Sequence, residues 1–91
     1  MQTSELKKLY TVKEFITTEG CEGKVGTKWY VLPAEMTAID AIKLVADKLH
    51  ISKDKVQETQ GYVRGDKLYL RNSWEKAPKG TSDVWALTVR R

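Results

Sequence analysis

The fold is decided by the stretch that runs from Thr37 to Val56, TAIDAIKLVADKLHISKDKV. In its first half, apolar residues recur at three- and four-residue spacing, which predicts an amphipathic helix over residues 38–50. Thr37 and Asp40 resemble a capping box, which marks where this helix begins. The apolar stripe is made by Ile39, Ile42, Val45, Ala46 and Leu49. We expect the stripe to be buried against the rest of the domain.

Strands separated by turns are expected on either side of this helix. In the last of them, Trp85, Leu87 and Val89 alternate with other residues, so we expect these three side chains to face the helix. Gly65 and Asp66 suit a tight hairpin turn. The predicted strands are residues 28–32, 62–63, 68–70 and 84–89, with a long turn over residues 72–82.

Two further segments carry helix-capping signals. Thr11 and Glu14 form a capping box within residues 10–18, whereas the β-branched residues of that segment favour a strand; we expect a helix there. Ser52 can cap a second helix that ends at Gly61. The resulting order is helix, strand, helix, helix, strand, long turn, strand.

Residues 44–56, LVADKLHISKDKV, resemble the helix-turn-helix of winged-helix DNA-binding domains. Ala46 is the small residue that lets the two helices of such a motif cross closely. The apolar residues that would fix their angle are Val45, Leu49, Ile51 and Val56. The resemblance implies a second helix whose N-terminal residues face the major groove of DNA, with Lys53, Lys55 and Gln57 as the contacting side chains. His50 departs from the pattern, because the turn of the motif favours glycine.

We therefore predict a single α+β domain over residues 1–91, with the order of elements of a winged helix. The alternative is a small mixed or antiparallel sheet packed on one long helix. Both arrangements fit a chain of 91 residues, which has room for one hydrophobic core.

Positive charge is concentrated in the last third of the chain. The formal net charge is +4, and residues 61–91 hold seven Lys and Arg against three acids, which accounts for the whole excess. A basic region of this kind favours an anionic partner, either nucleic acid or an acidic protein surface. The candidate contacts in this region are Arg64, Lys67, Arg71, Lys76 and Lys79.

Trp74 lies among these basic residues, in the polar turn. An aromatic ring beside cations can stack on a nucleic-acid base. It can equally anchor a protein interface or fold back as a lid over the core. The sequence leaves these three roles open.

Catalytic and metal chemistry have little support in the sequence. Cys21 and His50 are the only cysteine and the only histidine, too few for a standard zinc site. No nucleophile is paired with a base in a familiar motif, so we expect neither catalysis nor a cofactor. No apolar stretch has the roughly 18 residues of a membrane span. A single cysteine suits a reducing compartment, and we expect a cytoplasmic protein.

The function predicted from these observations is that of a small, non-enzymatic DNA-binding protein, such as a regulator or an accessory protein of a mobile element. The alternative is a protein-binding module, for example a small phage-type inhibitor of a host protein. In both cases the basic last third would carry the contacts.

Overall fold

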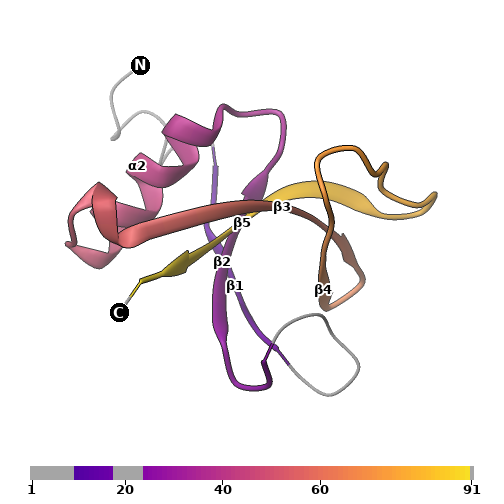
Figure 1. Cartoon of the computed structure of the whole chain (residues 1–91), viewed down its shortest axis with the longest axis horizontal. Helices are drawn as coiled ribbons and strands as arrows, with labels where there is room; N and C mark the ends of the chain where they lie inside the picture. The colour runs from indigo at the N-terminus through magenta and orange to yellow at the C-terminus, as the bar shows by residue number, and fades with distance from the viewer. Residues whose placement is uncertain (1–9, 18–23, 91) are drawn as a thin grey trace.

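The computed structural model describes residues 10–17 and 24–90. Among these residues, five strands form one antiparallel sheet in the order β1-β2-β5-β3-β4, and one α-helix lies against it (Figure 1). The elements are β1 (Lys13–Ile16), β2 (Lys28–Pro33), α2 (Ala38–Leu49), a 3₁₀ turn (Lys53–Lys55), β3 (Val56–Arg64), β4 (Lys67–Leu70) and β5 (Ser82–Val89).

The predicted winged helix is wrong, because sheet dominates the structure and only one α-helix is present in the described residues. The alternative comes closer, since it placed a sheet on one long helix. It did not anticipate five strands or their curl into a half-barrel.

The second predicted helix does not form. Ser52 does act as a cap, accepting a hydrogen bond from the Asp54 amide at 3.4 Å, but only one 3₁₀ turn follows. From Val56 onward the chain is β3, which pairs with β5 from Val56 opposite Val89 to Val63 opposite Ser82. The helix-turn-helix interpretation fails here, because the segment that should read the major groove is a central strand.

The helix expected within residues 10–18 is also wrong over its described part, where Lys13–Ile16 form β1. This strand pairs with β2, placing Phe15 opposite Trp29. The β-branched residues of the segment outweigh its capping box, because hairpin pairing with β2 provides hydrogen bonds and an aromatic pair that an isolated short helix lacks.

Helix α2 confirms the clearest sequence prediction. Thr37 caps it by accepting a hydrogen bond from the Asp40 amide at 3.1 Å. Val45 is fully buried, and Ile42 and Leu49 pack on the same cluster as Trp85, Leu87 and Val89. Ile39 is the exception in the stripe, with 66% of its surface exposed.

The end of α2 explains why His50 tolerates the backbone conformation that glycine favours. His50 is left-handed, with φ 55° and ψ 45°. Its amide donates to the Asp47 carbonyl at 3.3 Å, and the Ile51 amide donates to the Ala46 carbonyl at 3.0 Å. These two bonds form a Schellman motif, which satisfies helix carbonyls that would otherwise lack partners.

The sheet buries side chains on both faces. On one face, Leu32 and Leu87 join the helix cluster. On the other face, Trp29 and Val31 of β2 share a cluster with Leu68 of β4, although β5 and β3 lie between these strands. One hollow on this second face is lined by both Phe15 of β1 and Val63 of β3, although β2 and β5 lie between these strands, so this face is concave and α2 covers part of the convex one.

Gly61 occupies the middle of the curl, where β3 is flanked by both β4 and β5. A Cβ atom built at this position would lie 2.6 Å from the carbonyl oxygen of Tyr69. Gly61 was expected to end a helix; its role is instead to let the β4 backbone approach β3 closely.

Candidate binding surface

The most unusual element of the structure is the connection between β4 and β5, residues 71–81. Both strands pair antiparallel with β3, on opposite sides of it, so they run in the same direction. The chain must therefore cross over β3 between them. We call residues 71–81 the crossing loop.

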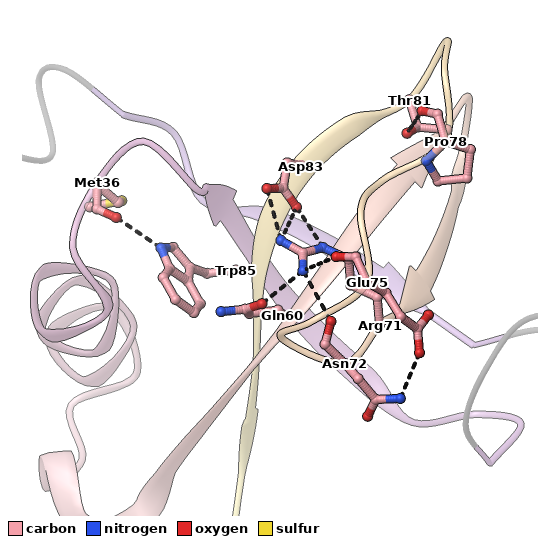
Figure 2. A network of polar contacts seen from close by, with 9 residues as sticks. All are labelled: Met36, Gln60, Arg71, Asn72, Glu75, Pro78, Thr81, Asp83 and Trp85. Atoms are coloured by element: carbon pink, nitrogen blue, oxygen red, sulfur yellow. Dashed lines mark hydrogen bonds and ion pairs between the residues drawn. The ribbon is translucent and has the colours of Figure 1, made fainter.

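Arg71 fixes the crossing loop to the strands beneath it (Figure 2). Its Nε and Nη2 donate to the two carboxylate oxygens of Asp83 at 3.0 and 2.9 Å, a bidentate pair. Its Nη1 donates to Gln60 Oε1 at 2.8 Å, joining the loop to β3 as well as to β5. The Arg71 side chain is only 11% exposed. The guanidinium thus links three segments that are distant in sequence.

The same guanidinium also shapes the loop itself. Nη1 of Arg71 reaches the carbonyl oxygens of Asn72 and Glu75 at 3.1 and 2.8 Å. The Glu75 amide donates to the Asn72 carbonyl at 3.0 Å, and the Asn72 side-chain amide donates to the Glu75 carboxylate at 2.7 Å. A tight turn around Ser73 and Trp74 is therefore held by hydrogen bonds from both sides.

Trp74 projects from this turn with 79% of its surface exposed. The role of a lid over the core is thereby excluded, whereas Trp29 and Trp85 do pack in the two clusters. Lys76 and Lys79 are also exposed and follow Trp74 in the loop. Because the turn is fixed by Arg71, the indole is presented with less freedom than on an unrestrained loop.

Two tyrosines and two further cations lie on the face that carries Arg71. In the β3–β4 hairpin, Tyr62 pairs with Tyr69 and Arg64 with Lys67, and residues two apart in a strand share a face. The tyrosine rings are stacked, with centroids 5.3 Å apart and planes 19° apart. Arg64 and Lys67 are exposed. The crossing loop is bonded to this face where Arg71 meets Gln60, so we group its exposed aromatic and cationic residues with the aromatic and cationic residues of the hairpin as the Trp74 surface: Tyr62, Arg64, Lys67, Tyr69, Trp74, Lys76 and Lys79.

The remaining predicted contacts lie elsewhere. Lys53 and Lys55 form the 3₁₀ turn before β3, and Gln57 is the second residue of that strand. Arg64 ends the same nine-residue strand, seven residues after Gln57, so about 23 Å of strand separates these two residues at 3.3 Å per residue. The structure thus places Lys53, Lys55 and Gln57 at the start of β3, away from the hairpin cations at its end.

No protein-family model, curated protein or solved structure matches this chain. Within residues 10–17 and 24–90, no cluster of three or more His, Cys, Asp or Glu side chains could hold a metal ion. The one α-helix found there is too short and too polar to cross a membrane. Cys21 lies outside the described residues.

Sequence reasoning located Trp74 and the cations but missed the residues that organise them. Gln60 and Asp83 were not singled out, because their partner Arg71 is 11 and 12 residues away and the contact depends on the crossing of β3. Tyr62 and Tyr69 carried a usable signal: both flank the predicted Gly65-Asp66 turn, and hairpin pairing around that turn places them opposite each other.

Proposed function

We propose that this protein is a non-enzymatic domain that binds single-stranded DNA through the Trp74 surface. The observation that carries the proposal is the 79% exposed Trp74 on a loop fixed by Arg71, with Lys76 and Lys79 beside it. Exposed aromatic rings between cations bind single strands by stacking on bases while the cations follow the phosphates.

Single strands suit this surface better than duplex DNA. The faces of unpaired bases are open to an indole ring, whereas those of a duplex are already stacked on each other. Reading of the major groove usually relies on an inserted helix or β-ribbon. The helix expected to do so is replaced by a 3₁₀ turn and a strand.

Within this proposal, Arg71 is a positioning residue rather than a phosphate contact. Its guanidinium bonds Asp83, Gln60 and two loop carbonyls, and its side chain is only 11% exposed. The phosphate contacts then fall to Lys76 and Lys79 and to the hairpin cations, Arg64 and Lys67. These four side chains are all exposed.

The test is a titration of a fluorescently labelled oligothymidine with the protein over a range of salt concentrations. Trp74→Ala should weaken binding by about 1–3 kcal/mol, the cost of losing one stacked base, and Trp74→Phe should recover part of it. Replacing both Lys76 and Lys79 by Ala should lower the salt-dependence slope by about 1.4, because each single-strand phosphate contact contributes about 0.7.

Lys53 and Lys55 provide the matched control. Replacing both by Ala removes the same charge from the other end of β3 and should change the affinity far less. If both double variants lose affinity equally, binding reflects net charge alone and the proposed surface is refuted.

An acidic protein surface is the second candidate partner, and one observation favours it. Tryptophan is enriched among residues that dominate protein interfaces, and Trp74 is both exposed and held in a fixed turn. If the wild-type protein binds no oligonucleotide even at low salt, this candidate replaces nucleic acid, and the Trp74→Ala variant becomes the probe for the protein partner.

A further inference from the structure

A second feature, distinct from the Trp74 surface, is a groove on the concave face of the half-barrel. Its volume is about 860 Å³, within the range of sites that hold small molecules or peptide side chains. Val31 lines it from β2, Val84 from β5, Phe15 from β1 and Val63 from β3. The groove therefore lies between β1, at one edge of the sheet, and the β3–β4 hairpin, at the other edge.

The β1 side of the groove has an open strand edge. Strand β1 is the outermost strand at its end of the sheet and pairs only with β2 among the described strands. Its other edge consequently presents backbone amides and carbonyls to which another strand can bond. Thr11, Lys13 and Phe15, at alternate positions, all line the groove beside this edge.

Charged groups mark two positions along the groove. Lys13, the first residue of β1, lines it between Thr11 and Phe15, and Glu35 lines it beyond the end of β2. Neither side chain makes an ion pair with another described residue. Since Lys13 is opposite Val31, Glu35 follows in the direction of Thr11, away from Phe15.

We propose that this groove binds an extended peptide segment of a partner protein, which adds antiparallel to the open edge of β1 as a further strand. The backbone of the segment pairs with β1, and its alternate side chains enter the groove. This mode gives affinity through main-chain hydrogen bonds and specificity through the pockets for every second residue.

Pairing with β1 fixes the chemistry of the segment. Read from its N-terminus, the residue opposite Phe15 is apolar, the next is basic opposite Glu14, and the next is acidic opposite Lys13, because opposite charges are favoured in directly opposed positions. A basic residue further toward its C-terminus meets Glu35. The segment thus favours an extended conformation and contains three consecutive residues in the order apolar, basic, acidic.

The experiment is a selection of random linear decapeptides, displayed on phage, against the full chain. Enriched peptides should share the apolar–basic–acidic order, and synthetic copies should protect β1 amides from hydrogen exchange. Methylating alternate backbone nitrogens should weaken the peptides at least about tenfold, since it removes strand-pairing donors. Failure to enrich any peptide, or enrichment of peptides that tolerate this methylation, overturns the proposal.

Charge reversal gives a second, independent test. Lys13→Glu should weaken the selected peptides by about threefold to tenfold, and a peptide with Lys in place of its acidic residue should regain affinity for that variant. Lys28→Glu, the same change on the face of β2 turned away from the groove, should have little effect. Equal losses in the two variants would refute a specific contact at Lys13.

The two proposals can fail separately. Peptide binding at β1 should persist in the Trp74→Ala variant, and oligonucleotide binding should persist in the Lys13→Glu variant. If Trp74→Ala abolishes peptide binding, the peptides occupy the Trp74 surface and the β1 groove is not their site.

Discussion

Substitution of Arg71 separates two roles that this residue could have. A phosphate contact needs only a positive charge, which lysine retains. A clamp needs the forked guanidinium, because one ammonium group cannot bond Asp83 in bidentate fashion while also reaching Gln60 and two loop carbonyls. Arg71→Lys therefore keeps the charge and removes the geometry.

The magnitude follows from the contacts. Nη1 has two hydrogens for three neutral acceptors, so Arg71→Ala loses about 2–3 kcal/mol of hydrogen bonding, at about 1 kcal/mol per bond. The Asp83 side chain is 45% exposed, so the ion pair adds no more than about 1 kcal/mol. We expect the free energy of unfolding to fall by about 2–4 kcal/mol for Arg71→Ala. A fall of about 1–2 kcal/mol is expected for Arg71→Lys, which keeps some of the bonds.

Urea denaturation measures these losses, and the oligothymidine titration measures their effect on binding at temperatures where each variant is folded. Asp83→Asn is the decisive companion variant. If Arg71 acts as a clamp, Asp83→Asn weakens oligonucleotide binding because the loop is less well held. If Arg71 contacts phosphate, Asp83→Asn strengthens binding by freeing the guanidinium. Tighter binding by Asp83→Asn, or an Arg71→Lys variant with wild-type stability and affinity, would refute the clamp.

Three further predictions concern the fold. Gly61→Ala should lower stability by about 1–3 kcal/mol, because its Cβ would lie 2.6 Å from a backbone oxygen of β4; a stabilised variant in urea denaturation would contradict the close approach. Leu44→Ala should lower the free energy of unfolding by about 2–5 kcal/mol, since Leu44 is fully buried, whereas Ile39→Ala should lower it by less than about 0.5 kcal/mol. Equal losses for the two variants in chemical denaturation would contradict the face of α2 that is buried. His50→Gly should raise the free energy of unfolding by up to about 1 kcal/mol, and with it the melting temperature, because glycine adopts the left-handed conformation without strain. A clear loss of stability would mean that the imidazole makes an essential contact.

Local signals predicted those parts of the fold that depend on local structure. The stripe of α2 and its Thr37 cap lie within one short segment, and both are found as expected. The same holds for the β3–β4 turn at Gly65, whose φ of 62° suits glycine. In each of these cases, the residues that decide the structure are close together in sequence.

The predictions that were wrong concern segments whose structure depends on residues that are distant in sequence. Ser52 caps a helical turn, as its side chain favours, yet the chain continues as β3 because β5 supplies hydrogen bonds from partners that are 33 residues away at Val56 and 19 residues away at Val63. The polar run Gln57-Glu58-Thr59-Gln60 hides this strand, since a central strand is normally apolar. The Arg71 network was hidden for the same reason: its partners come together only after the crossing of β3.

The length of the crossing loop favours a role beyond connecting two strands. Leu70 lies opposite Gly61 and Ser82 opposite Val63, so the loop spans two residues along β3 and two strand spacings across it, about 12 Å in all. An extended chain of the loop's length reaches about 36 Å. A few residues would be enough to pass over β3, and ordering the others costs conformational entropy. Arg71 offsets that cost for the turn around Trp74, where residues 72–76 are all exposed. A connection that is longer than necessary, is held by a nearly buried arginine and carries an exposed indole is the arrangement expected of a binding loop on a rigid scaffold.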